Sequence, residues 1–95
     1  MSEQPKTPTA SLLVGQKPAM NYVLYMVNQM KDEKEISVKA RGLSISKAVD
    51  VVEILRRRFI QNLTIGDIKF GTDEVEDEKS HQKRRISTIE IIIKK

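Results

Sequence analysis

The chain has 95 residues, enough for one domain with a modest core. It contains no cysteine and a single histidine, which excludes disulfides and thiolate chemistry and argues against a structural zinc site. Seventeen basic and 13 acidic residues give a net charge of +4, and no apolar run is long enough to cross a membrane, so we expect no membrane partner.

The charge is unevenly distributed along the chain. Residues 73–78 hold five of the 13 acidic residues, so the rest of the chain carries 17 basic and 8 acidic residues, a balance of +9. A basic body is typical of proteins that bind a polyanion, and an acidic segment indicates a region held away from it. The alternative is that the charge only keeps a small protein in solution.

The N-terminal third predicts one strand and one helix. Met1 to Ala10 has no apolar core and predicts a disordered tail ahead of a single domain over residues 11–95. A short apolar run at residues 11–14 predicts a first strand. Proline is favoured at the first position of a helix, and Pro18 opens a predicted helix over residues 18–31. Its apolar residues have helical spacing: Tyr22, Val23, Met26, Val27 and Met30.

A second strand and a longer helix follow. Ile36, Val38 and Ala40 alternate with polar residues in a predicted strand that Gly42 closes. Ser44 is a candidate N-cap for a helix of about 17 residues. Its buried stripe is predicted to contain Ile45, Ala48, Val49, Val52, Leu55 and Phe59. The apolar residues off this stripe predict a subunit interface; they are Val51 and Ile54.

The C-terminal part predicts a long β-hairpin. Ile68 and Phe70 alternate with polar residues in a third strand, and Ile89, Ile91 and Ile93 do so in a fourth. The polar residues 72–83 between them predict an extended tip. The element order is β-α-β-α-β-β, and strands joined through a helix are normally parallel. The sequence therefore predicts an α/β (mixed α+β) fold, with a four-stranded mixed sheet and two helices on one face.

This topology predicts a basic edge of the sheet. If the first two strands are parallel, Lys17 and Arg41 lie at the same edge, each beside a helix N-terminus, with Lys47 close by. Free N–H groups and the helix dipole favour an anion at such a place, and ligands of open α/β sheets bind beyond the carboxyl ends of the strands. The alternative is that Lys17 is a solvated loop lysine.

A second basic group opens the fourth strand at Lys83, Arg84 and Arg85, with Lys69 on the third strand as a candidate to lie across from it. A basic two-stranded ribbon can lie along a nucleic-acid groove. The alternative is a charged arm that its own residues keep soluble.

Nothing in the chain predicts catalysis or a cofactor. The lone His81 lies in a polar segment without a Ser or Cys nucleophile held beside it, and there is no P-loop or dinucleotide-binding motif. Asp50 and Glu53 are spaced for ion pairs with Arg56 and Arg57 on the helix rather than for acid–base chemistry.

Five short segments occur in order between about Leu12 and Lys94: 15–22 (GQKPAMNY), 39–42 (KARG), 45–50 (ISKAVD), 58–59 (RF) and 87–91 (STIEI). The first resembles the first-loop motif of the Alba family of archaeal chromatin proteins, the next two resemble that family's second strand and helix, and the last two resemble its later segments. The resemblance implies the fold reached above and a homodimer that binds double-stranded DNA, and also RNA, with little sequence preference. It further implies loop residues of the dimer body on phosphates and hairpin arms along the minor groove.

The residues and the resemblance together predict two sets of functional positions. The nucleic-acid contacts are predicted to be Gln16, Lys17, Asn21, Arg41, Leu43, Lys47, Lys69, Lys83, Arg84 and Arg85. The dimer or dimer–dimer interface is predicted to contain Val51, Ile54, Arg58 and Phe59, of which Phe59 matches an aromatic that joins neighbouring dimers in some members.

Three features depart from the family pattern. Gln16 and Leu43 stand where many members have a lysine and an arginine, and residues 73–78 are more acidic than an arm that enters a groove should be. They predict a second type of paralogue that binds duplexes more weakly, as a homodimer or as a heterodimer with a doubly basic paralogue. The loss of two cations should reduce the salt dependence of binding. The acidic segment is predicted to repel DNA or to contact a neighbour's basic surface.

We therefore expect a dimeric, chromosome-associated protein of the cytoplasm that binds nucleic acid through phosphates and shape. The first alternative is an RNA-binding protein of RNA maturation or stabilisation, which the relative affinity for A-form and B-form duplexes would separate. The second is a dimeric protein-interaction module without nucleic-acid contact. Charge reversal at Lys17 and Arg41 would leave that function intact.

Overall fold

The computed structural model describes residues 10–95 and has the predicted order of elements. The strands are β1 (Ala10–Leu13), β2 (Glu35–Arg41), β3 (Thr64–Glu76) and β4 (Lys83–Lys94). The helices are α1 (Ala19–Gln29) and α2 (Ser44–Ile54), and α2 continues into the π-helical turn η1 (Leu55–Phe59). The predicted tail lies outside the described residues except for Ala10, which is the first residue of β1 rather than part of the tail.

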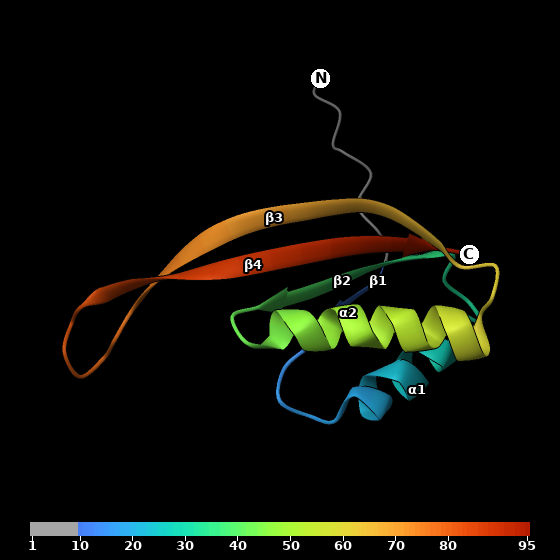
Figure 1. The fold of residues 1–95 in the computed structure, drawn as a ribbon, viewed down its shortest axis with the longest axis horizontal. Helices are drawn as coiled ribbons and strands as arrows, with labels where there is room; N and C mark the ends of the chain where they lie inside the picture. The colour runs from blue at the N-terminus through green and yellow to red at the C-terminus, as the bar shows by residue number, and fades with distance from the viewer. Residues whose placement is uncertain (1–9) are drawn as a thin grey trace, which may run out of the picture.

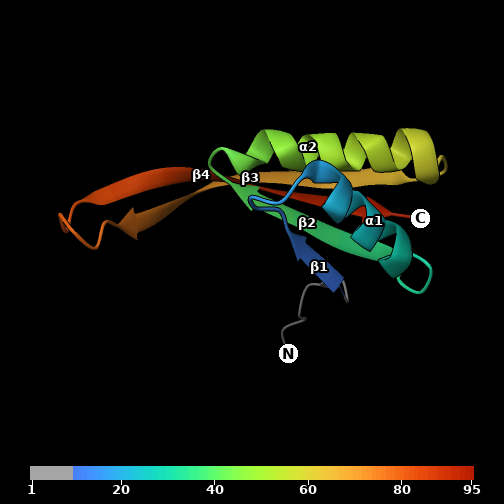
Figure 2. The same ribbon diagram turned by 90° about the horizontal axis from the view of Figure 1, so that it is seen from below.

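The four strands form one mixed sheet in the order β1-β2-β4-β3. Strands β1 and β2 are parallel, and β4 runs antiparallel to both β2 and β3. Both helices lie on one face of the sheet, as Figures 1 and 2 show from two directions. The predicted fold class is confirmed. Within residues 10–95, no helix has the length and apolar character needed to cross a membrane.

The core lies between the two helices and this face of the sheet. The alternation predicted for β2 and β4 holds, because Ile36, Val38 and Ala40 pair with Ile93, Ile91 and Ile89 across the two strands and are all buried. The remaining buried apolar residues come mainly from the helices and from the loops that lead into and out of them: Val14, Tyr22, Val23, Met26, Met30, Ala48, Val51, Val52, Leu55 and Leu63.

The buried face of α2 differs from the predicted stripe. Ala48, Val51, Val52 and Leu55 face the core at helical spacing, whereas Val49 is 42% exposed. Apolar residues occur on two sides of this helix, so their spacing alone selects no single face. The final turn is also π-helical, with Ile60 N–H donating to the carbonyl of Leu55 (2.8 Å). This wider turn shifts the helical phase and leaves Phe59 43% exposed, so its predicted burial was wrong.

The start of α2 is set by Gly42 rather than by a side-chain cap. Gly42 has φ = +61°, a left-handed conformation that suits glycine, and it donates to the carbonyl of Ser87 (2.8 Å). The turn it makes starts the helix at Ser44, with Leu43 before it and no side-chain capping bond. The prediction that Ser44 is the N-cap was therefore wrong. Its hydroxyl instead donates to the carbonyl of Gly15 (3.4 Å).

The β3–β4 hairpin is longer than β2 and continues beyond it as a two-stranded arm. Strand β2 ends where Arg41 pairs with Thr88, and the hairpin arm is the part beyond, residues 72–87 (Figure 1). The acidic segment predicted at the tip lies mostly within β3, which extends to Glu76. At the turn, Asp77 accepts from Lys79 N–H (3.0 Å), which lowers the pKa of its carboxyl group.

Candidate nucleic-acid interface

Two loops meet at the end of the sheet from which the hairpin arm projects. The first loop (residues 14–18) follows β1 and leads into α1, and the second loop (residues 42–43) follows β2 and leads into α2 (Figures 1 and 2). Because β1 and β2 are parallel, with Leu13 in register with Lys39, both loops lie at one end of the sheet. We call this end the loop end. The predicted placement of Lys17 and Arg41 at one edge is confirmed.

Most of the predicted contact residues of the protein body lie at the loop end. Gln16 and Lys17 in the first loop are exposed, as is Asn21 in the first turn of α1. Arg41 is exposed at the end of β2, and Leu43 in the second loop is 99% exposed. Both helices begin here, so their free N–H groups and positive dipole ends add to the charge of the two cations.

The first loop is bonded to both helices. The Tyr22 hydroxyl of α1 accepts from the N–H groups of Gly15 (2.9 Å) and Lys17 (3.2 Å). The Lys47 ammonium of α2 donates to the carbonyls of the same two residues, at 3.1 Å and 2.7 Å. Lys47, predicted as a nucleic-acid contact, thus has its ammonium group on the loop backbone.

The Tyr22 hydroxyl lies in a positive environment. Burial raises its pKa, but the two backbone N–H donors and the nearby ammonium groups of Lys47 and Lys17 outweigh burial, so the pKa lies below the usual value for tyrosine. The hydroxyl oxygen therefore acts as the acceptor for two backbone N–H groups of the first loop. Sequence reasoning treated Tyr22 only as a core residue, although a tyrosine on a buried stripe needs a partner for its hydroxyl.

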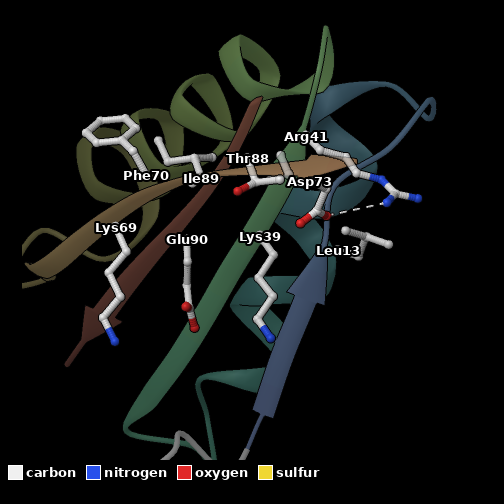
Figure 3. Close-up of a pocket in the computed structure, with 11 residues that line it drawn as sticks. Leu13, Lys39, Arg41, Lys69, Phe70, Asp73, Thr88, Ile89 and Glu90 are labelled. Atoms are coloured by element: carbon white, nitrogen blue, oxygen red, sulfur yellow. Dashed lines mark ion pairs between the residues drawn. The ribbon is translucent and has the colours of Figure 1, made fainter. Parts of the chain in front are cut away.

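Arg41 is bound by an acid from the base of the hairpin arm. Its guanidinium Nη1 lies 3.8 Å from Oδ2 of Asp73, and both side chains are about half exposed, at 55% and 54% (Figure 3). Asp73 belongs to the acidic segment that the sequence placed at a remote tip. No sequence signal points to this pair, because it depends on the register of a long hairpin.

The sheet face opposite the helices carries a shallow hollow of about 450 Å³ beside this ion pair. Lys39, Glu90 and Lys69 follow one another across β2, β4 and β3 and point to the same side (Figure 3). Ser37 donates to Glu90 at 2.6 Å. Lys69 is in register with Glu90, so its predicted position across from residues 83–85 was wrong. The pattern of side chains along the sequence did not determine the register between β3 and β4.

Two of the three basic residues that β4 contributes to the hairpin arm lie opposite acids. Glu76 is in register with Lys83, and Glu74 with Arg85, while Arg84 faces Val75. Residues 72–87 contain five acidic and four basic residues, a balance of −1, which leaves +5 on the rest of the chain. The net positive charge of this protein therefore lies outside the hairpin arm.

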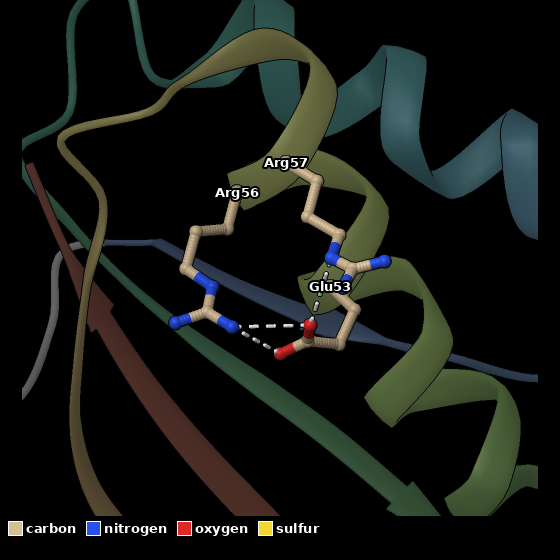
Figure 4. A network of polar contacts seen from close by, with 3 residues as sticks. All are labelled: Glu53, Arg56 and Arg57. Atoms are coloured by element: carbon tan, nitrogen blue, oxygen red, sulfur yellow. Dashed lines mark hydrogen bonds and ion pairs between the residues drawn. The ribbon is translucent and has the colours of Figure 1, made fainter.

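The arginines at the end of the long helix are partly engaged within it. Glu53 accepts from Arg56 Nη2 (2.9 Å) and lies 3.8 Å from Nε of Arg57, which confirms the intrahelical pairs predicted for Glu53 (Figure 4). Asp50 forms no ion pair with the residues that the structure describes, so its predicted pairing was wrong. Arg58 is exposed on the same turn. All three cations lie in the last helical turn, where positive charge complements the helix dipole.

The predicted interface residues of α2 do not share one environment. Val51 is fully buried in the core, so its predicted place at an interface was wrong, and Ile54 is partly buried against the core. The sequence analysis did not predict an exposed apolar surface on β3. Ile68 and Phe70 lie on the helix side of the sheet, in register with Ile91 and Ile89, yet are 47% and 77% exposed. Figure 3 shows Phe70 on the same side of the sheet as α2.

Comparison with known proteins places this arrangement in a family. The sequence pattern of the Alba family matches residues 10–72, more than half of the chain. The chain belongs to the Alba family. It is 45% identical over 86 residues to "DNA/RNA-binding protein Alba 1" of Archaeoglobus fulgidus, which covers 90% of this chain and 94% of that protein.

Further relatives agree in both sequence and fold. "DNA/RNA-binding protein Alba" of Nanoarchaeum equitans is 47% identical over 87 residues, covering 88% of this chain and 97% of that protein. Among solved structures, Alba from Thermoplasma volcanium has a TM-score of 0.83 at 41% identity, covering 90% of this chain and 99% of that chain. The resemblance read from the sequence is thus confirmed, and the names of the two relatives from Archaeoglobus fulgidus and Nanoarchaeum equitans describe DNA/RNA-binding proteins.

Proposed function

We propose that this Alba protein binds double-stranded DNA, and also RNA, with little sequence preference, as a chromosome-associated protein of the cytoplasm. One observation carries the proposal. Two parallel strands place Lys17 and Arg41 at one end of the sheet, beside the N-termini of both helices, and Arg41 also pairs there with Asp73 at the base of the arm. Charged groups and free N–H groups of this kind bind phosphate oxygens, which are the same in every sequence. The names of the curated relatives support the same ligand class.

The hairpin arm is proposed to follow the minor groove by its shape rather than by attracting phosphates. Its balance of −1 supplies no net attraction to a polyanion. Within the arm, however, the cations are all on β4 or in the turn, and the acids of β3 line the outer edge of the sheet. An arm that approaches DNA along β4 keeps the acidic strand farther from the phosphates.

A second copy of the chain is the partner we propose for the uncovered surface of β3. Ile68 and Phe70 are exposed there, and Val49 and Phe59 are exposed on the helix that lies on the same face of the sheet. Apolar surface of this kind on a small soluble domain marks an interface. The proposal covers a homodimer, or a heterodimer with a paralogue that shares this surface. A dimer would bring two loop ends to one duplex.

A titration at several salt concentrations tests the proposed function. Duplex DNA and duplex RNA of equal length are titrated with the wild type, Lys17→Gln, Arg41→Gln and the control Lys34→Gln, which removes an exposed lysine from the opposite end of the sheet. We expect the two loop-end variants to bind more weakly. The slope of log K against log salt should become shallower by about 0.9 for each phosphate that the variant no longer neutralises.

The outcomes separate the candidate functions. Equal reductions of affinity in all three variants would show that net charge matters and the loop end does not. A clear preference for duplex RNA over DNA would favour the role in RNA maturation or stabilisation. Absence of binding to either duplex at low salt would refute the proposal and favour a protein-interaction module.

A further inference from the structure

Tyr22 of α1 and Lys47 of α2 together bond the backbone of the first loop at four polar groups, and the Ser44 hydroxyl of α2 adds a longer bond to one of them (3.4 Å). Tyr22 accepts from the N–H groups of Gly15 and Lys17, and Lys47 donates to the carbonyls of the same two residues. These four groups flank Gln16 on both sides. The side chains of Gln16 and Lys17 remain exposed, so the loop backbone is fixed while its side chains stay available.

We propose that Tyr22 and Lys47 are positioning residues of the nucleic-acid site, which hold the first loop in the backbone arrangement that presents Lys17 to a phosphate. The inference rests on the function proposed above. A loop that lacked these bonds would have to be ordered when it binds, and the accompanying decrease in entropy would reduce the affinity. Because Tyr22 and Lys47 order the loop backbone when the protein folds, this loss of entropy does not reduce the affinity for the ligand.

Lys47 has a second effect that follows from where its ammonium lies. The carbonyl oxygens of Gly15 and Lys17 carry partial negative charge at the place where a phosphate would approach. The ammonium group covers both oxygens, at 3.1 Å and 2.7 Å, and leaves its own positive charge beside the site. Lys47 therefore favours an anion through the loop, without a direct contact of its own.

The hydroxyl of Tyr22 serves the loop rather than the core. Its side chain is only 9% exposed and packs among the core residues, a role that a phenylalanine ring would also fill. The oxygen atom adds the two bonds to the loop backbone. Removal of that oxygen alone should therefore release the loop and leave the core packing in place.

The first part of the test compares two variants of α1 that each lack one tyrosine hydroxyl group. Tyr22→Phe removes the loop acceptor, and Tyr25→Phe removes the hydroxyl of a tyrosine that is 46% exposed. We expect Tyr22→Phe to weaken duplex binding roughly 3- to 10-fold, the range expected when up to two neutral hydrogen bonds are removed. The slope against salt should not change, because every cation is retained. The amide protons of Gly15 and Lys17 should exchange faster, while those of the core strands keep their protection.

The second part of the test concerns Lys47 and remains informative if Tyr22→Phe folds poorly. Lys47→Met removes the donor and its charge, and Lys34→Met removes one charge at the far end of the sheet. We expect Lys47→Met to weaken binding more than Lys34→Met does, with faster exchange of the same loop amides. Lys47→Arg retains a charged donor and should restore most of the affinity.

The outcomes separate this inference from the proposed function. If Lys17→Gln weakens duplex binding but Tyr22→Phe and Lys47→Met bind like their controls, the positioning role is overturned and the proposed function stands. Faster amide exchange without weaker binding would overturn it in the same way, because an ordered loop would then be unnecessary. If the wild type binds no duplex, both fall together.

Discussion

Substitution of Asp73 by asparagine should strengthen the binding of duplex DNA. Asp73 holds the Arg41 guanidinium at 3.8 Å, so a phosphate must compete with it for the same cation. Both side chains are about half exposed, and an ion pair so exposed to solvent contributes only about 0.2–1 kcal/mol. We therefore expect Asp73→Asn to bind duplex DNA about 2- to 5-fold more tightly per protomer, since 1.4 kcal/mol corresponds to a tenfold change.

The salt dependence gives a second measure of the same effect. With Arg41 free to neutralise a phosphate, the slope of log K against log salt should become steeper by as much as about 0.9 per protomer. The gain in affinity should shrink at high salt, where exposed charges are screened. The assay is a fluorescence titration of one duplex with wild type and Asp73→Asn at four or more salt concentrations.

Two controls decide whether Arg41 is the cause. Asp67→Asn removes an exposed acid at the other end of the same strand and should change the affinity less. In an Arg41→Gln background, Asp73→Asn should have little of its effect, because the pair is already broken. Equal gains in Asp67→Asn and Asp73→Asn, or a full gain in the Arg41→Gln background, would refute this reasoning and leave only a general effect of net charge.

Three further predictions concern the fold and its surfaces. Leu55→Ala in the core should lower the free energy of unfolding by about 2–5 kcal/mol, and Leu24→Ala, whose side chain is 57% exposed, by much less, as measured in urea. In Tyr25→Phe, Tyr22 is the remaining tyrosine, and its absorbance titration should have a lower midpoint in the folded than in the unfolded protein. The free energy of unfolding should accordingly increase as the pH rises from the pKa of Tyr22 in the folded protein toward its ordinary value, and this increase is lost as the pH falls through the folded pKa. Equal midpoints in the folded and unfolded protein would contradict the prediction. Phe70→Glu should sediment as a smaller species than the wild type, and an unchanged mass would exclude the proposed β3 interface.

The sequence by itself determined the elements, their order and the end of the sheet at which the candidate site residues Lys17 and Arg41 lie. Alternating apolar residues in β2 and β4 and helical spacing in α1 reflect local geometry, which each segment imposes on its own side chains. The strand–helix–strand order made β1 and β2 parallel, and that alone places Lys17 and Arg41 together. These conclusions needed no knowledge of which distant residues touch.

Only the tertiary structure decided the features that depend on distant contacts. The sequence pattern did not decide which face of α2 is buried, because apolar residues lie on two sides of this helix. Packing against β2 and α1 buries Val51 and leaves Val49 exposed. The polar residues of the hairpin arm have no pattern that sets a register, so the Arg41–Asp73 pair appears only when β3 and β4 are aligned. The hydroxyl of Tyr22 likewise finds its partners across a loop whose path both helices set. A pattern along the chain records which face of a segment is apolar, whereas partners far apart in sequence are chosen by the packing of the whole domain.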